Sequence, residues 1–225
     1  MRSAEQLLAD SFNARGRAWE RWGPLDGDVL SHLVNPFFMG GPRWPGLREA
    51  FRVARRSDAV LVASDGLSDP FDPDEGPADV NGLGLECFAV SDSALEHLPG
   101  TWLFNMVWQV SQFAASRGDL ASLLEELGLL TTELQGVEIP EEYHGRFVTS
   151  EGRVGVILGM VEDPVPSVIA GPLSPIRLVS VKLLTVDELA FAIDSGDQGR
   201  RELSRRFLAP VLASSLSRRS VLEAA

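Results

Sequence analysis

Residues 50–90 read AFRVARRSDAVLVASDGLSDPFDPDEGPADVNGLGLECFAV and hold the most regular strand pattern of the chain. The segments 50–56 and 59–63 are rich in Val and Ala and lie two residues apart, which predicts two strands joined as a hairpin. After a long loop rich in Gly, Pro and Asp, the segment 82–90 predicts a third strand. Loops of this length within a domain are usually functional or mobile, so we expect one or the other of 64–82.

The third strand has two different faces. Alternation with period two puts Leu83, Leu85 and Cys87 on one face and Glu86 and Phe88 on the other. We therefore expect a strand that carries one carboxylate among otherwise apolar residues. A lone Cys in such a position is expected to be a buried structural thiol.

Along the whole chain, the predicted strands are grouped and do not strictly alternate with helices. This order predicts an α+β fold: a single domain with a mixed, largely antiparallel sheet flanked by helices. We expect an N-terminal helical part over 1–29, a central domain over 30–196, and a C-terminal helix and tail over 197–225. Helical spacing and capping residues predict helices at 4–21, 101–117, 119–128, 186–194 and 199–209, and further strands at 153–161, 167–171 and 176–184.

The segment 33–46 reads LVNPFFMGGPRWPG and is expected to be irregular because of its Pro and Gly content. We expect its aromatic residues Phe37, Phe38 and Trp44 to be buried nevertheless. A second loop is expected around Pro140.

The end of the chain, SSLSRRSVLEAA over 214–225, has no apolar periodicity. We expect this tail to be frayed.

The charge of the chain limits its partners. With 225 residues and a formal net charge of −12, it lacks the basic balance that phosphate binding needs, so we expect no nucleic-acid partner. No apolar stretch is long enough to span a membrane and no signal peptide is recognisable, so we expect a cytoplasmic protein without a membrane partner. Residues 57–116 hold ten acidic residues and no Lys or Arg. Either the Arg-rich ends pair with this acidic middle, or an acidic face attracts a basic partner.

Catalytic and metal-binding patterns are missing from the sequence. The three histidines, His32, His97 and His144, are widely separated, Cys87 is alone, and no nucleophile elbow or phosphate-binding loop is present. We therefore expect no catalytic residues, no metal, no cofactor and no enzyme activity. The alternative is an enzyme or small-molecule binder with an unrecognised site, for which Glu86, His144 and Asp69 are the candidates.

Six carboxylates are concentrated in the loop after the second strand. The calcium-loop register is absent and prolines interrupt the run, so a solvated loop or a partner-binding loop is the better interpretation. As candidate partner-binding residues we take the six acidic side chains of this loop, Asp65, Asp69, Asp72, Asp74, Glu75 and Asp79.

Two short motifs resemble those of the Suppressor of fused family. One is Gly66-Leu67-Ser68-Asp69, and the other is Gly82-Leu-Gly84-Leu-Glu86-Cys-Phe, leading to a helix that contains tryptophan. The segment 172–189 resembles the later part of the same domain. The resemblance covers about residues 30–195 and is to a compact, bacterial form of the family.

The resemblance implies a non-enzymatic protein-binding module that masks a protein partner. For bacterial members it implies an immunity protein that neutralises a toxin, and a basic toxin would suit the acidic middle of this chain. A scaffold subunit is a further alternative. We expect structural roles for the signature residues, with Glu86 either facing solvent or pairing with an Arg such as Arg52, Arg55 or Arg177. The signature residues are Gly66, Leu67, Ser68, Gly82, Gly84 and Glu86.

Overall fold

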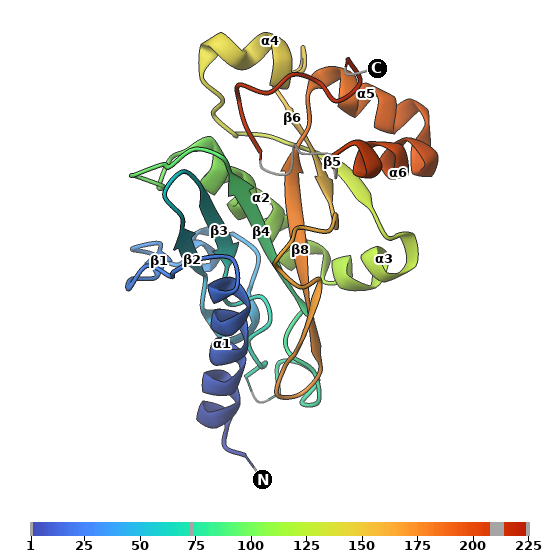
Figure 1. Cartoon of the computed structure of the whole chain (residues 1–225). Helices are drawn as coiled ribbons and strands as arrows, with labels where there is room; N and C mark the ends of the chain where they lie inside the picture. Colours follow the sequence, from blue (N-terminus) through green and yellow to red (C-terminus); the bar gives the residue numbers. More distant parts are fainter. Residues whose placement is uncertain (1, 73, 208–213, 224–225) are drawn as a thin grey trace.

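A computed structural model describes residues 2–72, 74–207 and 214–223 (Figure 1). Its described strands form one sheet in the order β1-β2-β3-β4-β8-β6-β5, with β7 paired to β8 outside this path. Among these described strands, only β4 and β8 pair in parallel, and the other pairs are antiparallel. The predicted α+β fold with a mixed, largely antiparallel sheet is therefore confirmed. The strands are β1 (Leu30–Ser31), β2 (Ala50–Arg55), β3 (Val60–Ser64), β4 (Leu85–Ser91), β5 (Leu130–Leu134), β6 (Val154–Leu158), β7 (Val168–Ala170) and β8 (Pro175–Leu183).

Helices flank the sheet, and most lie where the sequence predicts them. Ser3 caps α1 by accepting a hydrogen bond from the Gln6 N–H, and Thr101 caps α2 in the same way. The helices are α1 (Ala4–Glu20), α2 (Trp102–Arg117), α3 (Leu120–Leu127), α4 (His144–Phe147), α5 (Val186–Asp194) and α6 (Gly196–Phe207). Short 3-10 turns are η1 (Pro36–Met39), η2 (Pro45–Leu47) and η3 (Glu141–Tyr143).

The two faces of β4 meet different helices. Leu85 and Cys87 belong to the large core between the sheet and α2, whereas Phe88 packs against Trp19 of α1 with ring centroids 5.4 Å apart. Figure 1 shows α1 and α2 on opposite faces of these strands. A third apolar cluster packs α5 and α6 against the far part of the sheet. The alternation predicted for β4 is confirmed, and it fixes which residues face α1.

The loop expected around Pro140 is more ordered than the sequence indicates. Strand β5 precedes Pro140 and pairs with β6 along its full length, and η3 and α4 follow it. The two consecutive threonines of β5, Thr131 and Thr132, have the β-branched side chains that favour strands. With polar residues at three of its five positions, β5 gives a weak strand signal.

The expected burial of three aromatic residues in 33–46 holds only in part. Trp44 is buried, with 1% of its surface exposed, and stacks edge-on against Phe51. Phe37 is half-buried. Phe38 is 71% exposed, so the expectation for it is wrong. The capped turn η1, with Asn35 at its start and Gly40 at its end, holds Phe38 away from the core.

The expectation of a frayed tail is also wrong for residues 214–223. Ser214 forms a parallel bridge with Ser91, at the end of β4. Arg218 is buried and forms two hydrogen bonds with the carboxylate of Glu188 in α5, at 2.7 and 2.6 Å. The tail is therefore part of the folded domain.

Candidate functional site

The six candidate carboxylates fall into two groups. Asp65 and Asp69 are fully buried, while the other four are exposed. This corrects the expectation of one acidic surface loop, because two of its members lie in the interior beneath α1. The exposed members are Asp72, Asp74, Glu75 and Asp79.

The two buried aspartates belong to a cluster that we call the ionic cluster, made of Arg15, Arg48, Asp65, Asp69 and Glu86. Arg15, at the middle of α1, donates from Nε to Asp65 (2.6 Å) and from Nη2 to Asp69 (2.7 Å). Arg48 donates from Nε to the other oxygen of Asp69 (2.9 Å). The Glu86 carboxylate lies 3.5 Å from the Arg15 Nε. A buried charge is tolerated only when it is paired and hydrogen-bonded, and here each charge has such partners.

Glu86 ties the two signature motifs together. It accepts hydrogen bonds from the backbone N–H groups of Gly66 (3.1 Å) and Ser68 (3.0 Å), and from the Ser68 hydroxyl (2.6 Å). The Ser64 hydroxyl donates to its second oxygen. Between these contacts, Leu67 points into the main core. These contacts hold the turn at 64–68 against β4.

Glu86 pairs with an arginine, as one of the two expectations has it, but not with any of the three named as examples. The guanidinium beside it is that of Arg15, in α1. Arg52 instead stacks over the ring of Phe12, and Arg55 pairs with Asp26. Alternation predicted that Glu86 faces away from the main core but could not show that α1 covers that face.

Burial and charge act against each other in the ionic cluster. Burial favours the uncharged form of Arg15, but the nearby carboxylates of Glu86, Asp65 and Asp69 outweigh it and raise the pKa of Arg15. Burial raises the pKa of Glu86, with Arg15 opposing and Asp65 adding to that increase. Three carboxylates share two guanidinium groups. Arg15 contacts all three, so it neutralises much of their negative charge.

Two glycines of the signature lie where a side chain has no room. A Cβ on Gly66 would stand 2.0 Å from the carbonyl oxygen of Arg48. A Cβ on Gly82 would stand 2.5 Å from the carbonyl oxygens of Leu67 and Asp69, and its φ of +47° also favours glycine. Gly84 has a φ of +70° but more space around it.

Replacing Gly66 with alanine is therefore expected to destabilise the fold by about 1–3 kcal/mol or more, because the added methyl group overlaps backbone that cannot move freely. Gly145→Ala is the matched control, since nothing lies within 4 Å of a Cβ there. Urea unfolding of both variants measures the difference. Equal stability of the two variants would show that the signature turn has room to relax.

An exposed apolar segment is linked to two of the exposed carboxylates through Arg43. Leu33, Val34, Phe38 and Met39 are all exposed, with Met39 at 79%. Arg43 connects the two parts: it pairs with Glu75, lies 3.7 Å from Asp72 and stacks over the ring of Phe37 at 5.6 Å.

We call this region the acidic–apolar surface. It consists of Leu33, Val34, Phe38, Met39, Asp72, Asp74, Glu75 and Asp79. Isolated exposed apolar residues are ordinary, but a group of them rimmed by polar residues marks an interaction site. Of its apolar members, the sequence analysis expects only Phe38 to be buried.

The residues considered for catalysis are not brought together. Asp69 and Glu86 are in the ionic cluster, whereas His144 lies in α4 with its Nε2 2.7 Å from the carbonyl oxygen of Ile139. Cys87 is buried, and burial raises the pKa of its thiol. Within the described residues, no group of three or more His, Cys, Asp or Glu side chains could hold a metal ion. No helix in the same residues has the length and apolar character needed to cross a membrane.

The fold is similar to that of solved Suppressor of fused structures. The Sufu–Fu complex crystal structure aligns with a TM-score of 0.58 at 14% identity, over 97% of this chain and 93% of that chain. Drosophila Suppressor of Fused aligns with a TM-score of 0.58 at 15% identity, over 97% of this chain and 52% of that chain. No family model and no curated protein matches the sequence. The chain has a Suppressor of fused-like fold, as its signature motifs predict.

Proposed function

We propose that this Suppressor of fused-like chain is a non-enzymatic protein-binding module that masks a protein partner. The observation that carries the proposal is the acidic–apolar surface, in which Arg43 links an exposed apolar segment to exposed carboxylates. The fold adds support, because one of the similar structures is described as a complex of Sufu with Fu.

The composition of this surface indicates the kind of partner it fits. Phe38 and Met39 are large side chains that lose their contact with water only when another surface covers them. Asp74 and Glu75, together with Asp72 and Asp79, would favour a partner that carries basic residues around an apolar patch. Arg43 neutralises only part of this negative charge.

In its more specific form, the proposal is that the partner is a basic toxin and that the chain is its immunity protein in a bacterial cytoplasm. The resemblance to compact bacterial members and the acidic middle of the chain support this form. Cys87, a free thiol, is compatible with a reducing compartment.

Co-expression with the products of the neighbouring genes tests this function. We expect one of these products to co-purify with the chain and to inhibit growth when expressed without it. If none of them binds the chain, the toxin form of the proposal fails.

Once a partner is captured, its affinity for the double variant Phe38→Ser/Met39→Ser is expected to be at least about tenfold lower, because two apolar contacts are lost. Leu127→Ser/Ile193→Ser is the matched control, since these two residues are exposed but lie in α3 and α5. Isothermal titration calorimetry measures both affinities. Equal loss in the two double variants would place the partner elsewhere.

A further inference from the structure

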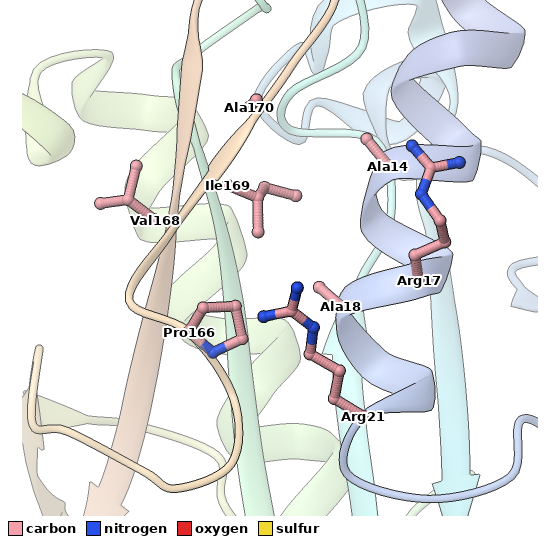
Figure 2. A pocket seen from close by; sticks show the side chains of 8 residues that line it. All are labelled: Ala14, Arg17, Ala18, Arg21, Pro166, Val168, Ile169 and Ala170. Carbon is pink, nitrogen blue, oxygen red and sulfur yellow. The ribbon is translucent and has the colours of Figure 1, made fainter.

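A groove lies between the second half of α1 and β7 (Figure 2). Its volume is about 340 Å³, which is enough for a few side chains of a ligand. The residues that line it are Ala14, Arg17, Ala18, Arg21, Pro166, Val168, Ile169 and Ala170.

Small side chains on α1 create the space. Ala14 and Ala18 face the strand at a spacing of four residues, one helical turn, and leave room where larger residues would fill it. Ile169 packs against the core cluster beneath α1, so the floor of the groove is apolar and continuous with the core. Both walls of the groove, α1 and β7, are therefore held in place by the same apolar cluster.

Two arginines stand on the helix side of this groove. Arg17 and Arg21 are four residues apart, so they lie on the same side of α1, and Figure 2 shows Arg21 extending toward Pro166. Both are exposed, and neither forms an ion pair or a side-chain hydrogen bond with any residue that the structure describes.

Two exposed arginines with the same spacing on another helix are paired. Arg201 and Arg205, also four residues apart and on α6, pair with Asp197 and Glu202 of their own helix. No carboxylate lines the α1–β7 groove, although the chain as a whole carries a net charge of −12. The groove is thus a local cationic site with an apolar floor in an acidic protein.

We propose that the α1–β7 groove binds an acidic peptide segment of a protein partner. Arg17 and Arg21 pair with its carboxylates, since guanidinium groups form charge-assisted hydrogen bonds with carboxylates. Ala18 and Ile169 contact an aliphatic side chain beside those carboxylates. A peptide satisfies both features, whereas a small inorganic anion would leave the apolar floor in contact with water.

This site is distinct from the acidic–apolar surface because its charge is opposite and its residues come from α1 and β7. It would engage a different segment of the same partner or a different partner. The proposal therefore goes beyond the function proposed above and does not depend on it.

Fluorescence anisotropy with a labelled peptide of alternating glutamate and leucine tests the site. We expect saturable binding to the full chain that weakens as salt is raised, because exposed charges are screened. Arg17→Gln/Arg21→Gln is expected to weaken binding at least about tenfold, since each exposed pair contributes a few-fold. The control Arg201→Gln/Arg205→Gln removes the same charge from α6 and is expected to change binding by less than about twofold.

Three results would overturn the proposal. One is the absence of saturable binding by the wild-type chain up to about 1 mM peptide, because a Kd above that value is too weak for specific recognition. The second is an equal loss of peptide affinity in both double variants, which would show that only the net charge of the chain matters. The third is a dimer of the chain that only Arg17→Gln/Arg21→Gln dissociates, which would assign the groove to a second copy. Thermal melting checks that the variants fold, and Phe38→Ser/Met39→Ser is expected to keep full peptide binding.

Discussion

Replacing Arg15 with methionine is expected to lower the free energy of unfolding by about 3–5 kcal/mol, the range typical for breaking a buried ion pair. Arg15 is fully buried and donates to Asp65, Asp69, Ser11 and the Ser68 hydroxyl. Methionine fills most of the volume but leaves the carboxylates with a single guanidinium group. Because domains are stable by only about 5–15 kcal/mol, urea unfolding should show a large shift.

The loss is expected to shrink as the pH is lowered from about 7 to about 5. Arg15 lowers the pKa of Glu86, so its removal raises that pKa further above the value in the unfolded chain. An acid whose pKa is raised in the folded state binds its proton more tightly there than in the unfolded chain. Falling pH therefore stabilises the folded form of the variant relative to that of the wild type.

Arg17→Met is the matched control for stability, because Arg17 lies on the same helix, is exposed and has no ion pair among the described residues. We expect it to change the unfolding free energy by less than about 0.5 kcal/mol. If Arg15→Met and Arg17→Met were equally stable, the ionic cluster would have no role in holding α1 on the sheet.

Replacing Arg218 with methionine is expected to cost about 3 kcal/mol or more and to release the tail. Arg218 donates to both oxygens of Glu188 and to the carbonyl oxygen of Leu183 (2.7 Å). Its guanidinium also lies over the rings of Phe147 and Phe207, at 5.7 and 4.9 Å. Without it, the buried carboxylate of Glu188 loses its charge partner.

Limited trypsin digestion and urea unfolding measure this release. The neighbouring Arg219→Met serves as control, because Arg219 is exposed and its replacement also removes one positive charge and one cleavage site. We expect faster cleavage and lower stability only for Arg218→Met. Equal behaviour of the two variants would mean that the tail is held by other contacts.

Most of the fold was predictable because its signals are local. The hairpin of β2 and β3, the alternation of β4 and the caps of α1 and α5 depend on a few adjacent residues. Strand β5 was missed because its polar residues, Thr131, Thr132 and Glu133, leave little apolar pattern.

The site was less predictable because it depends on contacts between distant segments. Asp65 and Arg15 are 50 residues apart, and no spacing in the sequence links them. The apolar character of Phe38 predicts burial. The sequence does not show that the capped turn η1 holds this side chain in solvent. Arg218 was overlooked because its neighbours are mostly serine and arginine, a composition typical of loose tails.

One of the two interpretations of the charge pattern, pairing between the Arg-rich ends and the acidic middle, holds for the buried aspartates. Arg15 and Arg48 come from the arginine-rich end and pair with Asp65 and Asp69 of the acidic middle. The exposed carboxylates beyond them, such as Asp74, face solvent and remain available to a basic partner.

Amide hydrogen exchange of the chain with and without a captured partner tests the central proposal most directly. We expect the partner to slow exchange in peptides that cover 29–39 and in those around Asp74, the two parts of the acidic–apolar surface. Slowed exchange confined to other parts of the chain, such as α5 and α6, with none in these peptides, would contradict the assignment of this surface to partner binding.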